Sequence, residues 1–283
     1  MPGQVTVRLP DGSTRSLPEG SSSAELAAAV GKRLAAAAVA AVVDGQEVDL
    51  GRPLPDGAEV AIVTADTDAW RAVLRHSTAH VLAQAVLRLW PGAEYAIGPP
   101  IEDGFYYDFS LPGGATFSEE DLARIEEEMR AIVAQDQPFV RRELTTGEGL
   151  ELFADQPFKR EIIEGVGADA ALGAEAELDM APGAAVSVYR NATNGDGFVD
   201  LCRGPHVAST ARLGHFKLLR VAGAYWRGDE KRPQLQRIYG TAWESEAALA
   251  DYLHRLEEAE RRDHRRIGAE LDLFSFPGEV GPG

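Results

Sequence analysis

Two compact pairs of chemically reactive side chains stand out in this sequence of 283 residues. RHSTAH at 75–80 contains His76 and His80, and LCRGPH at 201–206 contains Cys202 and His206. Together the pairs use the single cysteine and three of the six histidines. Imidazole and thiol groups bind metals and transfer protons. Each pair alone is a weak signal, but a fold that joined them would form one site, and we predict that they act jointly.

The local sequence predicts how each pair is presented. His76 and His80 are four residues apart, so a helix places both imidazoles on one face, one turn apart. Cys202 and His206 flank Arg-Gly-Pro, which cannot continue a helix, so we expect this pair on a tight loop after a strand. The zinc-protease signature requires a glutamate directly after the first histidine. Ser77 stands there instead, which argues against a protease.

Three histidines and a cysteine are ligand types that suit tetrahedral zinc. A catalytic zinc keeps one position open for water, whereas four protein ligands would close the coordination shell. A closed site would be structural, yet the surrounding sequence has enough apolar helix and strand to build a core without it. We therefore predict no tightly bound metal, and a pocket that captures zinc at His76, His80, Cys202 and His206 when zinc is abundant.

Other polar groups lie near the pairs in sequence or in apolar settings. Asp200 precedes Cys202 by two residues, on the same side of a strand. In GFYYDF, strand alternation directs one of Tyr106 and Tyr107 inward. Lys159 opens the apolar helical stretch FKREII. Routine roles, such as a core tyrosine or an exposed lysine, remain open for each residue on these grounds.

The first 64 residues have the pattern of a small independent unit. VTVRL and TRSL predict a hairpin around PDGS, and Ser22 with Glu25 predicts a capping box before an alanine-rich helix that ends near residue 38. A second hairpin is expected around Asp44-Gly45, followed by the strand AEVAIVT. This order is typical of a β-grasp, ubiquitin-like fold, which by itself says little about function.

The remaining sequence predicts a larger α+β unit. An apolar helix carries the histidine pair and ends at Trp90-Pro91-Gly92, strands cover 101–111, and Ser118 caps a second helix. Residues 165–185 are expected to form a loop, and VSVYRNATNGDGFVDLC two strands. A long, charged helix then suggests an arm between domains. The predicted fold class is α+β: a β-grasp domain, a larger α+β domain and a long C-terminal linker helix.

Composition and charge limit the function further. No signal peptide and no apolar run of membrane-spanning length is evident, and a single cysteine suits a reducing cytoplasm. The net charge of −17 argues against non-specific attraction to nucleic acid or anionic membranes. Residues 212–237 are an exception, with seven basic residues against two acids. They would hold RNA if they gathered on one face, although a solvated surface is the simpler interpretation.

Four long motifs, in the same order, resemble a known family. HSTAHVLAQA, AIGPPIEDGFYYDF, VDLCRGPH and GAYWRGDEKRPQLQRIYGTAW are similar to the editing domain of bacterial threonyl-tRNA synthetases. The first 64 residues resemble the TGS domain of that family, and RRDHRRIGAELDLFSF resembles its linker helix and the opening of its catalytic domain. The likeness covers nearly the whole chain, and residues 165–185 depart from the family pattern.

The resemblance implies hydrolysis of serine that has been attached in error to tRNA(Thr). Serine lacks one methyl group of threonine, which gives a binding site only ~1–3 kcal/mol of discrimination, so a second, hydrolytic site is needed. Ester hydrolysis requires an oriented water, a base and donors for the oxyanion, which imidazoles, a lysine and backbone amides can supply. By matching position, the resemblance implies catalytic roles for His76, His80, Cys202, His206, Lys159 and Asp200, and substrate-binding roles for Tyr107, Gly98 and Arg203.

The resemblance also implies a domain organisation. We expect a TGS-like domain at 1–64, an editing domain at 65–242, a linker helix at 243–270 and the start of a truncated class II catalytic domain at 271–283. ATP and a second zinc would belong to the absent catalytic domain, through which a full-length family member forms a homodimer. Editing needs no cofactor of its own. Its partner is tRNA(Thr) charged with serine, in the cytoplasm and without a membrane.

Two other functions remain open. A free-standing trans-editing deacylase, related to alanyl-tRNA editing proteins, would carry a similar two-pair signature. TGS domains also occur in regulatory proteins, so a non-catalytic tRNA-binding or regulatory module is the second alternative. The TGS-like start and the ending DLFSF favour a piece of threonyl-tRNA synthetase over a free-standing factor.

Overall fold

The structure is a computed structural model of the chain, and it describes residues 3–65, 67–165, 185–193 and 196–262. The chain divides into two compact units, Met1–Glu244 and Ser245–Gly283. Within the described ranges, no helix combines the length and apolar character needed to cross a membrane. The predicted domain boundaries at 64 and 242 remain predictions.

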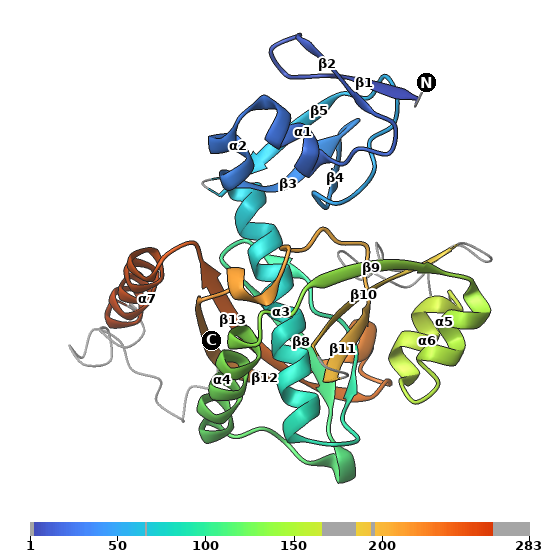
Figure 1. Cartoon of the computed structure of the whole chain (residues 1–283). Coiled ribbons are helices and arrows are strands. Elements are labelled where there is room, and N and C mark those ends of the chain that lie inside the picture. Colours follow the sequence, from blue (N-terminus) through green and yellow to red (C-terminus); the bar gives the residue numbers. More distant parts are fainter. Residues whose placement is uncertain (1–2, 66, 166–184, 194–195, 263–283) are drawn as a thin grey trace, which may run out of the picture. The chain divides into compact units, whose positions relative to one another are not determined.

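The N-terminal part of the first unit has the β-grasp order of elements (Figure 1). Its elements are β1 Gln4–Arg8, β2 Thr14–Pro18, α1 Ser23–Val30, α2 Lys32–Ala37, β3 Ala38–Val43, β4 Gln46–Val48 and β5 Val60–Thr64. Both predicted hairpins form, β1 with β2 and β3 with β4, and β5 pairs with β3. The Ser22–Glu25 capping box also forms. Buried side chains such as Val7, Leu26 and Val60 make up the core of this part.

The predicted alanine-rich helix ends near residue 38 as expected, since α2 ends at Ala37 and strand β3 follows. The prediction of a single helix is wrong, because Gly31, with extended backbone, separates α1 from α2. Glycine has a low helix propensity, which favours a break at this position. Strand β3 then pairs with β5 on one side and β4 on the other.

The larger part of the first unit contains two antiparallel sheets. One has the order β12-β13-β8-β6, with β7 also paired to β8, and the other has the order β11-β10-β9. The strands are β6 Glu94–Tyr95, β7 Pro100–Ile101, β8 Gly104–Ser110, β9 Phe139–Leu144, β10 Val186–Thr193, β11 Asp196–Leu201, β12 His215–Tyr225 and β13 Gln234–Trp243. The helices are α3 Asp68–Leu89, α4 Glu119–Ala134, α5 Thr146–Leu152 and α6 Pro157–Ile163. The predicted α+β fold class is confirmed.

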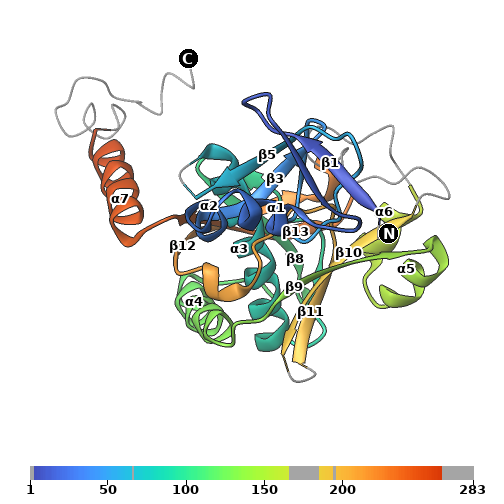
Figure 2. The same ribbon diagram turned by 45° about the horizontal axis from the view of Figure 1, so that its top comes forward.

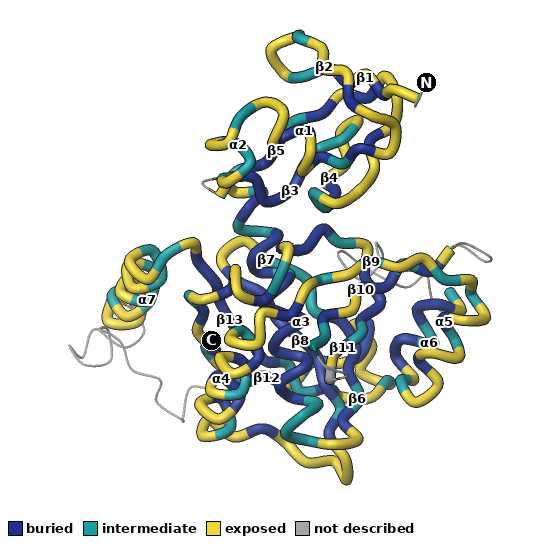
Figure 3. Tube along the Cα trace, viewed as in Figure 1, coloured by how far each residue is buried: buried dark blue, intermediate teal, exposed yellow. Residues whose placement is uncertain are grey.

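Helix α3 is the element that positions the histidine pair. It packs on strands β8 and β13, and α4 lies beside it in both views (Figures 1 and 2). Most of its length is buried, as the dark blue trace shows (Figure 3). Thr67 caps its start by accepting a hydrogen bond from the backbone N–H of Trp70, and the helix ends before Pro91. A helix buried on several sides holds its side chains in fixed rotamers, which suits a site.

The second unit contains helix α7, Glu246–Arg261, which is capped by Ser245 and has no buried residue. This helix confirms part of the predicted linker helix. The rest of that prediction, after residue 262, and the predicted catalytic-domain start at 271–283 lie outside the described residues. Most of the predicted loop at 165–185 does as well.

Candidate functional site

The two reactive pairs meet in the fold. Helix α3 supplies His76 and His80, and the loop after β11 supplies Cys202 and His206. The Sγ atom of Cys202 lies 3.2 Å from Nε2 of His76 and 3.2 Å from Nε2 of His206. One potential ligand atom from each of the four residues lies within 4.8 Å of all the others. The joint cluster expected from the sequence is therefore present in space.

Hydrogen bonds around Ser77 determine the tautomer of His206. The Ser77 hydroxyl donates to the carbonyl of Val73 at 2.8 Å, which uses its only proton. Its oxygen accepts from the backbone N–H of Val207 at 3.1 Å and lies 3.0 Å from Nδ1 of His206. Nδ1 of His206 must therefore carry the proton, and its Nε2 lone pair faces the Cys202 thiol. Ser77, which the sequence analysis used only to exclude a protease, thus orients His206.

A cavity of about 280 Å³ lies on one side of this cluster. Seven of the nine predicted site residues line it: His76, His80, Gly98, Lys159, Asp200, Cys202 and Arg203. Ile97, Pro99, Pro100, Leu201 and Gly204 complete the lining. The two other predicted residues do not line it: Tyr107 donates a hydrogen bond to Asp200, and His206 lines a different cavity together with Asp49 and Tyr189.

A buried charge network forms the polar end of this cavity. Nζ of Lys159 lies 2.5 Å from Oδ1 of Asp200 and donates to the hydroxyl of Tyr107 at 3.2 Å. That hydroxyl in turn donates to Oδ2 of Asp200 at 2.6 Å, and Nε2 of His80 is 3.4 Å from the same oxygen. The ammonium group also lies 5.1 Å and 5.6 Å from the ring centroids of Tyr95 and Tyr107. Lys159 is therefore a buried, held cation and not the exposed lysine of the routine alternative.

Burial controls the protonation of the cluster. It lowers the pKa of His76 to about 4, with a further contribution from Lys159, and it lowers the pKa values of His80 and His206 well below the ordinary value. Burial also raises the pKa of the Cys202 thiol. The three imidazoles and the thiol are thus neutral near pH 7. Burial raises the pKa of Asp200 as well, while Lys159 and Tyr107 oppose that rise.

Gly98 is required by a close approach of the backbone to Tyr107. A Cβ atom at Gly98 would lie 2.1 Å from Cδ2 and 2.5 Å from Cε2 of the Tyr107 ring, which no real structure tolerates. The strand prediction for the neighbouring tyrosines is half right. Tyr107 contacts the site, but Tyr106 is also buried. The Tyr106 ring lies beside the Tyr239 ring and the Arg237 guanidinium.

Residues far away in sequence contact His206 and hold the Cys202–His206 loop in place. Oδ1 of Asp49 accepts a hydrogen bond from the backbone N–H of His206 at 2.8 Å, and its Oδ2 accepts from the hydroxyl of Tyr189. The His206 ring lies 4.9 Å from the Phe139 ring in a stacked arrangement and 4.5 Å from the Tyr189 ring. The sequence analysis missed Asp49, Tyr189 and Phe139. Nothing in the local sequence marks them, since Asp49 and His206 are 157 residues apart.

The basic segment 212–237 is largely neutralised within the fold. Lys217 pairs with Glu126 at 2.8 Å, and Arg227 and Arg232 both pair with Glu161, at 2.9 and 2.6 Å. Arg237 makes two hydrogen bonds of 2.7 Å to Asp108. Four of the seven basic residues therefore have acidic partners from other elements, which weakens the interpretation of this segment as an RNA-binding surface.

The ligand types of the cluster fit zinc. Tetrahedral coordination at ordinary Zn–N and Zn–S lengths separates a nitrogen and a sulfur ligand by about 3.6 Å. The Sγ–Nε2 distances of 3.2 Å are hydrogen-bond contacts, so a small outward movement of these side chains would admit an ion. The cluster can thus hold zinc. Among the described residues, Cys202 is hydrogen-bonded to His76 and His206, whereas the buried Nδ1 atom of His80 has no hydrogen-bond partner.

Comparisons with known proteins identify two domain families in this chain. Residues 5–64 match the TGS domain, and residues 186–239 match the Threonyl and Alanyl tRNA synthetase second additional domain. The threonine--tRNA ligase of Rubrobacter xylanophilus is 52% identical over 280 residues, which are 99% of this chain and 40% of that protein. The one of Citrifermentans bemidjiense is 49% identical over 282 residues, or 99% of this chain and 41% of that protein. The threonine--tRNA ligase of Thermobifida fusca is 51% identical over 250 residues, which are 87% of this chain and 37% of that protein.

The chain thus spans about 40% of the length of these relatives. The resemblance to threonyl-tRNA synthetases that the four motifs indicated is confirmed, together with a TGS domain and an editing-type domain.

Proposed function

Because this chain resembles threonine--tRNA ligases along 99% of its length and contains their TGS and second additional domains, we propose that it hydrolyses the ester of serine attached to tRNA(Thr). Both the substrate and the location of the reaction in the cytoplasm belong to this proposal. The observation that carries it is the cavity of about 280 Å³, in which neutral imidazoles face a buried Lys159–Asp200 pair.

His76 is the base in this proposal. It is the least buried of the three clustered histidines, it lines the cavity, and its lowered pKa keeps the imidazole neutral and able to accept a proton. A water beside His76 gives up a proton to the ring as its oxygen attacks the ester carbonyl. Cys202 is within hydrogen-bond distance of both His76 and His206, and it holds the His76 ring beside the cavity.

Lys159 stabilises the negative charge that develops on the carbonyl oxygen. Asp200 and Tyr107 fix its ammonium group before substrate binds, so little reorganisation is needed during the reaction. When the tetrahedral intermediate collapses, the bond between the acyl carbon and the ribose oxygen breaks. The protonated His76 returns its proton to that oxygen, and the products are free serine and uncharged tRNA.

The walls of the cavity are the proposed basis for selecting serine. Discrimination against threonine depends on excluding one methyl group, and rigid walls such as Pro99, Pro100 and the Cys202 loop can do this by steric exclusion. Deacylation should therefore be faster for seryl- than for threonyl-tRNA(Thr). Equal rates for the two esters would contradict the proposed selectivity.

The test is a single-turnover deacylation assay on the purified chain with seryl-tRNA(Thr). We expect His76→Ala to lower the rate by at least about 100-fold, the usual contribution of a general base. His254→Ala is the matched control, because His254 is an exposed histidine on a different helix. Absence of deacylation by the unsubstituted chain would leave a non-catalytic tRNA-binding module as the better interpretation. Equal effects of the two substitutions would remove His76 from the mechanism.

A further inference from the structure

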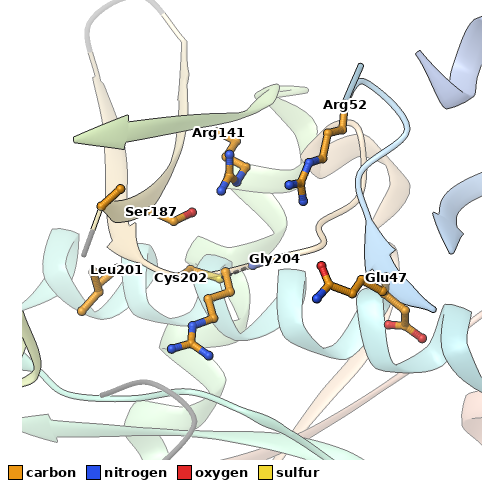
Figure 4. Close-up of a pocket in the computed structure, with 10 residues that line it drawn as sticks. Glu47, Arg52, Arg141, Ser187, Leu201, Cys202 and Gly204 are labelled. Atoms are coloured by element: carbon orange, nitrogen blue, oxygen red, sulfur yellow. Dashed lines mark hydrogen bonds between the residues drawn. The ribbon is translucent and has the colours of Figure 1, made fainter. Parts of the chain in front are cut away.

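A second cavity, of about 440 Å³, lies on the other side of the Cys202 loop (Figure 4). Besides the loop that contains Cys202, its walls come from three other places in the chain: the region after β3, which supplies Glu47 and Arg52; strand β9, which supplies Arg141; and strand β10, which supplies Ser187. The picture shows the guanidinium groups of Arg52 and Arg141 directed to the same space above Cys202 and Gly204. Neither arginine was singled out by the sequence.

The lining of this cavity is suited to an anion. Arg52 and Arg141 line this cavity with the one carboxylate of Glu47, and Arg203, which has an interaction of its own, also lines it, in a chain whose net charge is −17. No acidic side chain in the described ranges pairs with Arg52, and Arg141 pairs at 2.9 Å with Glu143, which is 59% exposed. Such a positive cluster in an acidic protein needs a reason, because like charges held together repel.

A buried hydroxyl group points to the same ligand. Ser187 Oγ is inaccessible to solvent, and it has no hydrogen-bond partner among the residues that the structure describes. A buried hydroxyl without a partner costs free energy, and a ligand, water or ion that supplied the missing hydrogen bond would remove that cost. Arginine forks and a hydroxyl donor together are the groups that bind phosphate oxygens.

The two cavities share one wall. Leu201, Cys202, Arg203 and Gly204 line both the cavity that contains His76 and the arginine cavity. A polymer whose terminal ester occupies the first cavity can therefore place the adjoining part of its backbone at the second by crossing this wall. In a tRNA that part consists of the phosphates of the nucleotides next to the aminoacylated end.

We propose that Arg52 and Arg141 bind backbone phosphates of the 3′-terminal nucleotides of the aminoacyl-tRNA, while the ester lies in the cavity lined by His76. This inference rests on the function proposed above. Arg52 comes from the TGS region and Arg141 from the larger α+β part, so both parts contribute to one substrate site. The role proposed for the TGS region is to hold the end of the RNA beside the hydrolytic site.

The test measures binding, which does not depend on hydrolysis. Fluorescence anisotropy would compare uncharged tRNA(Thr) with the same RNA lacking its four 3′-terminal nucleotides, for the unsubstituted chain, Arg52→Gln and Arg141→Gln. We expect each substitution to weaken binding of the full-length RNA about tenfold, as the loss of one charge-assisted contact does. The slope of log K against log salt should fall by about 0.7 for each arginine, the value for single strands. Binding of the shortened RNA should not change.

Arg142→Gln is the matched control. Arg142 follows Arg141 on strand β9 and lines a different cavity, since successive strand residues point to opposite faces. Arg52→Lys and Arg141→Lys retain the charge and should retain most of the salt dependence. The inference is overturned if Arg52→Gln and Arg141→Gln weaken the binding of both RNAs equally, or weaken binding no more than Arg142→Gln does. It is also overturned if the two substitutions weaken the binding of inorganic phosphate as much as that of the full-length RNA. A chain that binds as expected but does not deacylate would refute only the proposed hydrolysis.

Discussion

The buried pair of Lys159 and Asp200 allows a quantitative test of the site. Their side chains are 2% and 4% exposed, and Nζ lies 2.5 Å from Oδ1. Removing one partner of such a pair leaves the other charge buried without compensation, which typically costs about 3–5 kcal/mol. We expect that loss in the free energy of unfolding for Asp200→Asn and for Lys159→Met. The double variant removes both charges, so its loss in free energy of unfolding should be markedly smaller than the sum of the losses in the two single variants.

The assay is a double-mutant cycle from guanidinium unfolding of the four proteins. We expect a coupling free energy of at least about 2 kcal/mol for Lys159 and Asp200. The control is Arg160 with Glu164 on the same helix, a pair that is 43% and 41% exposed and should couple by only about 0.3–0.5 kcal/mol. Additivity of the two buried substitutions to within about 0.5 kcal/mol would refute the view that Asp200 neutralises Lys159 in the folded protein.

Three further predictions concern the loop, the pH dependence and the metal. Asp49→Ala should lower the deacylation rate about tenfold or more, because the loop loses the acceptor of the His206 N–H, while Asp11→Ala on an exposed turn should have no effect; equal rates for both would contradict this. Because the pKa of His76 is lowered from 6.5 to about 4, the deacylation rate should fall on the acid side near pH 4. The contribution of this pKa shift to the free energy of unfolding should be complete above pH 6.5 and should decline as the pH falls towards 4. A fall in the rate near pH 6.5 would contradict a desolvated base. Metal-free protein should deacylate after chelation, whereas stoichiometric zinc in elemental analysis, with activity lost on chelation and restored by zinc, would show a metal-dependent site.

Sequence alone determined the features that depend on neighbours within a few residues. The Ser22 capping box, the helix cap at Ser118 and the turn at Asp44-Gly45 all form as predicted, because each rests on local hydrogen bonds or local backbone conformation. The spacing of His76 and His80 likewise predicted their shared helix face. The break at Gly31 was the exception, since it divides the predicted alanine-rich helix into α1 and α2.

Only the tertiary structure decided which distant groups meet. Cys202 reaches His76 across 126 residues of sequence, and Asp49 reaches His206 across 157, distances over which no periodicity carries information. The same applies to charge. The sequence drew attention to residues 212–237, yet four of those basic groups form ion pairs with Glu126, Glu161 and Asp108, while Arg52 and Arg141 converge beside the site. Whether a charged side chain is available to a ligand depends on the partners that folding brings to it, and those partners lie on other elements.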